Sequence, residues 1–159
     1  MNSSVAAGRT ELPIVEVLPD HFEVLLDDGL LQVTLQGSIA LCLYDAVEEA
    51  GAVVHLRVVV GTGASTDASD ETLAADLMLI SSCMERLKIV APAARHWQGR
   101  VLVHHGTDGG LELLGRSIVQ AVTHCCTDRK IRIVQSDAQQ GASVTMQFRP
   151  SMGQYRLNV

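Results

Sequence analysis

Aromatic residues are scarce in this chain, with two Phe, two Tyr and one Trp among 159 residues. Proteins that bind single-stranded nucleic acid stack the bases on aromatic side chains, so this shortage argues against that class of function. Clusters of Lys and Arg are also lacking, and the formal net charge is -6. The acidic balance argues against nucleic acid and anionic membranes as main partners. The same charge is no obstacle to a protein partner.

Long apolar runs and paired-cysteine motifs are lacking as well. No apolar run reaches the roughly 18 residues of a membrane span. The N-terminal stretch MNSSVAAGRTELP has no charged region followed by an apolar one, as a signal peptide would. None of the four cysteines forms a CxxC motif. We therefore expect a cytoplasmic protein with reduced thiols and no membrane insertion.

The histidines invite a metal-site hypothesis, since His104 and His105 are adjacent and His96 precedes them. Adjacent residues of a strand point to opposite faces of the sheet, so this pair cannot easily share one ion. The spacings typical of zinc ligands are missing too. We expect no metal and no cofactor.

Aliphatic residues are abundant, because 47% of the chain is hydrophobic despite so few aromatics. This length and composition suit one domain with a sizeable core. Residues 1–12 are polar and small, which predicts a loose tail before a domain over 13–159. Apolar runs predict strands over 14–17, 22–26, 30–35, 39–44, 52–60, 100–105, 130–135, 143–148 and 154–159. Asp27-Asp28-Gly29 predicts a hairpin turn between two of them.

Two segments have helical periodicity, one from about residue 70 to Leu87 and one over 113–126. In the first, Leu73, Leu77, Ile80 and Met84 form one apolar stripe. Two helices cannot cover both faces of a sheet with so many strands. The sequence therefore predicts an α/β fold, a single-domain layered sandwich of β-sheets with two main helices outside.

One stretch, VTLQGSIALCLYDAVEEAGAVVHL over residues 33–56, raises a question of chemistry. Ser38 with His55 is the pairing of a nucleophile with a base in acyl transfer. The residues alone also fit a plain structural interpretation, with Ser38 as a turn residue after Gly37 and His55 as a core histidine. Cys42 lies within the apolar run, where a thiol is poorly ionised, so we expect a core residue. Asp45 is expected to end the strand and cap the next turn.

The same stretch resembles the CheD family of chemoreceptor glutamine deamidases, whose members carry a segment like G-S-C-V-A-V-C-L-Y-D, then a loop glycine and a histidine. Aligning Cys42-Leu43-Tyr44-Asp45 on this segment puts Ser38 at the family's catalytic cysteine. His55 then falls on the catalytic histidine and Gly51 on the loop glycine. Weaker likeness continues in the right order through RVLVHHGTDGGLELLGRSIVQAV and the closing strands.

The resemblance implies a CheD-like layered sandwich and a cytoplasmic chemotaxis protein that hydrolyses receptor glutamine side chains to glutamate. Ser38 would be the nucleophile and His55 the base, with Thr34 assisting. Gln32 and Gly37 would belong to the binding site. The partner would be a helical chemoreceptor segment or the phosphatase-type chemotaxis protein that binds this family.

Departures from the family pattern bear on activity. Gln32 occupies the position of the family's assisting threonine, although Thr34 lies two residues along on the same strand face. Gln139-Gln140 replaces a glycine pair. A serine needs a base that a third group orients, and the sequence shows no such group. We therefore expect weak or lost activity. The alternative is a non-catalytic, CheD-like interaction protein. A serine engineered in place of a native cysteine would leave the other departures unexplained.

Overall fold

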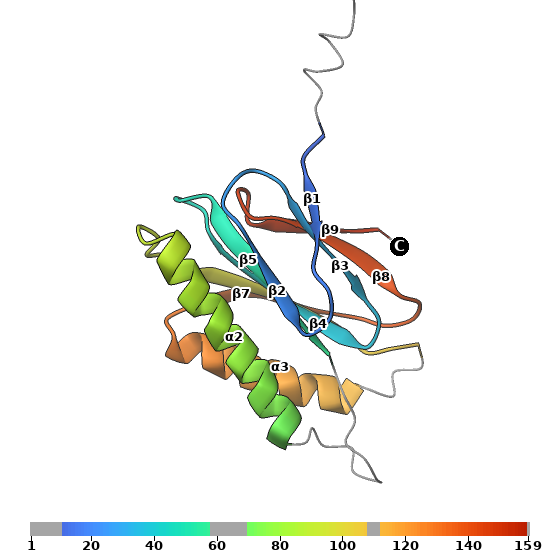
Figure 1. The fold of residues 1–159 in the computed structure, drawn as a ribbon. Helices are drawn as coiled ribbons and strands as arrows, with labels where there is room; N and C mark the ends of the chain where they lie inside the picture. The colour runs from blue at the N-terminus through green and yellow to red at the C-terminus, as the bar shows by residue number, and fades with distance from the viewer. Residues whose placement is uncertain (1–10, 58–69, 108–111, 159) are drawn as a thin grey trace, which may run out of the picture.

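The structure is a computed structural model that describes residues 11–57, 70–107 and 112–158. The predicted tail lies almost wholly outside these residues, as does the end of the strand predicted over 52–60. The predicted fold class is confirmed, since the described residues form two helices and nine strands in two mixed sheets. Three layers are visible in Figure 1, with the helices on one side, one sheet in the middle and the other sheet outside.

The middle sheet has five strands in the order β2-β5-β4-β6-β7. Its strands are β2 (His21–Leu25), β4 (Ser38–Asp45), β5 (Ala50–Arg57), β6 (Gln98–His104) and β7 (Arg132–Gln139). Strands β4 and β5 are buried on both faces, as their nearly continuous apolar sequences predict. Only β6 and β7 are parallel, and helix α3 (Glu112–Asp128) makes the crossover that a parallel pair needs.

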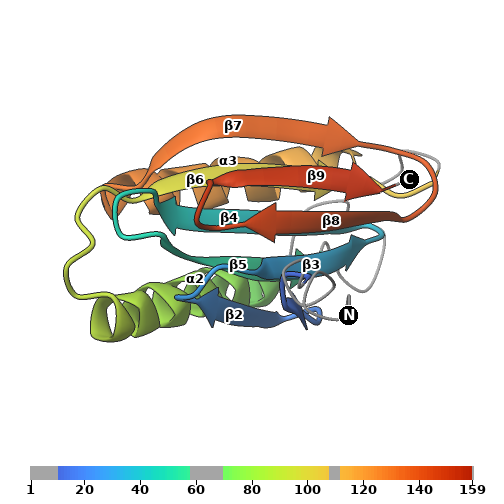
Figure 2. The same ribbon diagram turned by 90° about the horizontal axis from the view of Figure 1, so that it is seen from above.

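The outer sheet has four strands in the order β1-β3-β8-β9. Its strands are β1 (Ile14–Glu16), β3 (Leu30–Leu35), β8 (Val144–Arg149) and β9 (Gln154–Asn158). Figure 2 shows β8 and β9 running along the middle sheet. Aliphatic side chains from both sheets fill the layer between them, with Phe148 and Tyr44 in contact. The functional candidates lie at one end of this layer.

Helices α2 (Asp70–Val90) and α3 cover the other face of the middle sheet. The core on that side combines Ile80, Met84 and Leu87 of α2 with Leu114 and Ile118 of α3. α2 extends beyond the predicted end at Leu87 by nearly one turn. Pro92 lies two residues beyond its end at Val90, where proline cannot continue the helix.

The predicted hairpin at Asp27-Asp28-Gly29 is wrong. β2 pairs with β5 of the middle sheet, whereas β3 pairs with β1 and β8 of the outer sheet. The turn therefore carries the chain from one sheet to the other. Asp28 accepts hydrogen bonds from Arg149 and Ser151, which fixes this crossing against the end of β8.

The predicted pairing of the strand at 39–44 with the strand that follows is confirmed. β4 and β5 are antiparallel neighbours over their whole length. The connecting turn covers residues 46–49, whereas Gly51, expected in the loop, lies inside β5. A Cβ at Gly51 would come within 2.5 Å of the Leu43 carbonyl oxygen. This glycine therefore serves close packing between strands.

Candidate functional site

Ser38 lies where the chain crosses from β3 to β4 through Gln36 and Gly37. Gly37 has a φ of 63°, in the left-handed region that favours glycine. Ser38 is only 3% exposed and begins β4 on the face toward the outer sheet. The Gln36 backbone N–H donates to Ser38 Oγ over 3.3 Å. The tight crossing thus holds the hydroxyl in a defined place between the two sheets.

His55 reaches Ser38 from the neighbouring strand. In the β4–β5 register His55 lies opposite Ala40, which makes it a diagonal neighbour of Ser38 on the same face. Its Nε2 is 3.0 Å from Ser38 Oγ, and its Nδ1 is 3.1 Å from the carbonyl oxygen of Val17. The side chain is 1% exposed. The structure therefore brings together the two residues that the sequence paired.

The Val17 carbonyl fixes the tautomer of His55. A carbonyl oxygen can only accept a hydrogen bond, so Nδ1 carries the proton. In the neutral ring Nε2 is then an acceptor, and the Ser38 hydroxyl donates to it. This is the arrangement that a general base needs before it removes the proton of a nucleophile.

Burial controls the charge of His55. It lowers the pKa of the imidazole below its ordinary value of 6.5, while the Val17 carbonyl and the charge of Asp20 oppose this effect. At neutral pH the ring is therefore uncharged and its Nε2 lone pair is available. The buried environment also disfavours the imidazolium that forms during attack, and a carbonyl stabilises that cation less than a carboxylate would.

Thr34 and Gln32 lie away from this pair, contrary to the expectation that Thr34 assists there and that Gln32 belongs to the binding site. In β3 the alternate residues Leu31, Val33 and Leu35 fill the layer between the sheets. Thr34 and Gln32 therefore point to the outer face of the outer sheet. Gln32 accepts a hydrogen bond from Gln147 over 2.7 Å on that face. The prediction was wrong because the chain changes sheets at residues 36–37. Even-numbered residues therefore point outward in β3 but into the layer between the sheets in β4.

Two contacts at the site have no signal in the sequence pattern. The third group that orients His55 is a main-chain carbonyl, that of Val17, and any residue type could supply it. His104 of β6, considered above only as a metal ligand, accepts a hydrogen bond from the Gly37 N–H over 3.0 Å. Both partners lie beside the crossing that presents Ser38. The first contact depends on the placement of Val17, just after β1, against His55 of β5, and the second on the pairing of β4 with β6.

Cys42 and Asp45 have structural roles, as expected. Cys42 is fully buried with its Sγ near Met146 Sδ, and burial raises the pKa of its thiol far above the ordinary range. Asp45 Oδ1 accepts from the N–H groups of Val47 and Glu48, so it caps the turn. Its Oδ2 accepts from the N–H groups of residues 95 and 96. Asp45 thereby ties the β4–β5 turn to the segment before β6.

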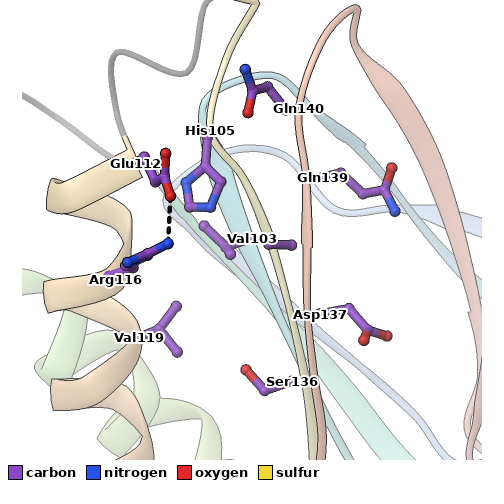
Figure 3. Close-up of a pocket in the computed structure, with 10 residues that line it drawn as sticks. Val103, His105, Glu112, Arg116, Val119, Ser136, Asp137, Gln139 and Gln140 are labelled. Atoms are coloured by element: carbon purple, nitrogen blue, oxygen red, sulfur yellow. Dashed lines mark hydrogen bonds and ion pairs between the residues drawn. The ribbon is translucent and has the colours of Figure 1, made fainter.

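A separate cavity of about 320 Å³ lies between α3 and β6–β7 (Figure 3). Glu112 and Arg116 of α3 form an ion pair at its wall, and the His105 ring points between helix and sheet. His105 packs so closely on Gly115 that a Cβ there would come within 3.0 Å of Nδ1. His104 and His105 face opposite sides of the middle sheet, so this cavity is not part of the Ser38 site.

No family model and no curated protein matches this chain. Among residues 11–57, 70–107 and 112–158, no group of three or more His, Cys, Asp or Glu side chains is arranged to hold a metal ion. No helix in the part of the chain that the structure describes is long and apolar enough to cross a membrane.

Proposed function

We propose that this chain is a CheD-like protein that hydrolyses the side-chain amide of protein-bound glutamine slowly, with Ser38 as nucleophile and His55 as base. One observation carries the proposal, namely the contact of Ser38 Oγ with a histidine whose other nitrogen is bound to a backbone carbonyl. Neutral His55 in this tautomer meets the first requirement of a serine acyl-transfer site.

The proposed reaction has two halves. Ser38 Oγ attacks the amide carbon while His55 Nε2 takes the hydroxyl proton and passes it to the leaving nitrogen, so ammonia departs and an ester to Ser38 remains. Water, deprotonated by the same Nε2, then attacks the ester. The products are glutamate and free Ser38, and one water is consumed for each ammonia released.

Two features of the site make slow turnover the expected outcome. A serine hydroxyl is a far weaker acid than a thiol, so it depends wholly on the base. The base is buried, and a neutral carbonyl rather than a carboxylate supports it. Replacing the carboxylate of a serine triad costs about 10⁴-fold in turnover because the histidine then has the wrong tautomer. Here the Val17 carbonyl keeps the correct tautomer, so about 10⁴-fold is the upper limit of the handicap we assign.

A helical chemoreceptor segment in the cytoplasm is the proposed substrate, and this part rests on the resemblance to CheD. The acidic balance of the chain, with a formal net charge of -6, agrees with a protein partner rather than a polyanion. The phosphatase-type chemotaxis protein that binds this family is the second partner of the proposal.

The test is ammonia release from a synthetic helical peptide that carries glutamines on one exposed face. We expect slow release by the natural chain and none by Ser38→Ala or His55→Ala. Ser151→Ala is the matched control, since the Ser151 hydroxyl binds Asp28 at a distant turn. Release that is equal in the natural chain and Ser38→Ala would exclude Ser38 as the nucleophile.

A non-catalytic interaction protein is the second candidate function. The near-complete enclosure of Ser38 and His55 favours it, since a substrate amide has little access to either side chain. In this case the same peptide binds with equal affinity to the natural chain and to Ser38→Ala, and no ammonia appears. Mass spectrometry of the recovered peptide, which gains about one mass unit for each deamidation, separates the two functions.

A further inference from the structure

His104 binds backbone groups from three separate connections of the chain. Its Nδ1 accepts from the N–H of Gly37 over 3.0 Å and from the N–H of Gly106 over 3.1 Å. Its Nε2 lies 2.9 Å from the carbonyl oxygen of Ala142. These groups belong to the β3–β4 crossing, the end of β6 and the β7–β8 connection. His104 itself is 0% exposed, while its partners Gly37 and Gly106 are half-buried and Ala142 is exposed.

The contacts determine the protonation of the ring. Nδ1 receives two donors, so it carries no proton, and Nε2 faces a carbonyl, so it must donate. His104 is therefore neutral with its proton on Nε2. His55 has the opposite tautomer, with its proton on Nδ1. Two buried histidines of opposite tautomer thus flank the crossing at Gly37, one holding the backbone and one the Ser38 hydroxyl.

We propose that His104 is a positioning residue for Ser38, which acts by fixing the N–H of Gly37; this inference rests on the proposed function of Ser38. Gly37 precedes Ser38 directly, and its left-handed backbone directs the chain into β4. Without an acceptor at Nδ1, the half-buried N–H of Gly37 loses its protein partner, and the crossing shifts toward another acceptor. Ser38 Oγ then leaves the 3.0 Å contact with His55. Small misplacements of this kind cost up to about 100-fold in reaction rate.

Two isosteric substitutions separate the two ends of the ring. In His104→Asn the amide oxygen can take the place of Nδ1, so the acceptor for Gly37 remains while the donor to Ala142 is lost. In His104→Gln the amide nitrogen can take the place of Nε2, so the donor to Ala142 remains while the acceptor for Gly37 is lost. Both variants lose the ring and its packing. A purely structural role therefore predicts similar effects for both.

The experiment compares these variants by two readouts, with His105→Gln as a control for the loss of a buried histidine on the opposite face. The first readout is hydrogen exchange at the Gly37 amide. The second is the rate of covalent modification of Ser38 by a small fluorophosphonate, which needs a positioned serine but no natural substrate. Urea unfolding of each variant reports its stability independently.

In His104→Asn we expect the Gly37 amide to stay protected from hydrogen exchange and Ser38 to be modified at a rate within about threefold of the natural rate. In His104→Gln we expect the Gly37 amide to lose its protection from hydrogen exchange and Ser38 to be modified at least about tenfold more slowly. The proposal would be overturned if both variants lost Gly37 protection and Ser38 modification equally, or if these losses simply tracked the loss of stability measured in urea. If the natural chain is not modified at all, the function proposed for Ser38 fails. Gly37 exchange then still decides whether His104 fixes the crossing, with equal protection in the Asn and Gln variants as the contradicting result.

Discussion

Ser38→Cys is the substitution that probes the candidate site most sharply. It replaces a hydroxyl 3.0 Å from His55 Nε2 with a thiol, whose ordinary pKa is about 8.5 and which ionises far more readily than serine. The larger sulfur must fit in a place where Ser38 is only 3% exposed.

The expected gain follows from the weakness of the base. Burial lowers the pKa of His55, so the introduced thiol forms only a small fraction of thiolate–imidazolium pair at neutral pH. Even so, the nucleophile no longer depends wholly on proton removal during attack. We expect the rate of acylation to rise by about 100-fold or more, equivalent to about 2.7 kcal/mol of barrier.

The assay is alkylation by iodoacetamide at pH 7, followed by ammonia release. Burial raises the pKa of Cys83 and Cys126 to about 12, so these thiols remain unreactive in the folded protein. The half-buried Cys125 is removed as Cys125→Ser to lower the background. Alkylation of the introduced thiol should be faster than that of Cys125 in the unsubstituted chain, because His55 accepts its proton, and His55→Ala should slow it. An introduced thiol that reacts no faster than Cys125 does in the unsubstituted chain, or whose alkylation rate is unchanged by His55→Ala, would refute the proposed pairing.

Three further predictions follow from buried titratable groups. Because burial lowers the pKa of His55, fluorophosphonate modification of Ser38 should stay constant from pH 8 to 7 and decline only below 6.5; an inflection above 6.5 would contradict this. Burial, with repulsion from Asp20, raises the pKa of Asp76 to about 7. Between about pH 4 and pH 7 the carboxyl is therefore protonated in the folded protein and ionised in the unfolded chain, so the free energy of unfolding falls as the pH rises through this range. Asp76→Asn should therefore raise the free energy of unfolding in urea by about 1–2 kcal/mol at pH 8 and not at pH 4, and equal effects at both would count against it. Burial acts to raise the pKa of Asp45, but hydrogen bonds from four backbone N–H groups lower that pKa below its ordinary value. The contribution of Asp45 to stability is therefore present above about pH 4 and is lost as the pH falls below that value. Asp45→Asn should cost about 1–3 kcal/mol at pH 7, and a neutral result would show that the turn needs no such cap.

Much of the fold follows from hydrophobic patterning, since β4 and β5 carry long aliphatic runs and the two helices carry apolar stripes. The hairpin at Asp27-Asp28-Gly29 shows the limit of turn chemistry. The same residues that close a hairpin also allow a crossing between two sheets, and only the pairing partners distinguish the two. Sequence spacing contains no information on those partners.

The candidate site was partly predictable for a similar reason. The resemblance to the CheD segment singles out Ser38 and His55, and the two antiparallel strands bring them together. Thr34 was misplaced because the crossing at Gly37 changes the face that β3 presents. The carbonyl of Val17 could not be found at all, since a backbone atom leaves no trace in the choice of residue.

The central claim is that Ser38, activated by His55, forms an ester with a glutamine side chain. Hydroxylamine tests this most directly, because it attacks such an ester and leaves a γ-hydroxamate on the peptide. Incubation of the natural chain with the helical glutamine peptide and hydroxylamine should yield hydroxamate that mass spectrometry assigns to glutamine positions, while Ser38→Ala should yield none. No hydroxamate from the natural chain, or the same amount from Ser38→Ala, would contradict the claim.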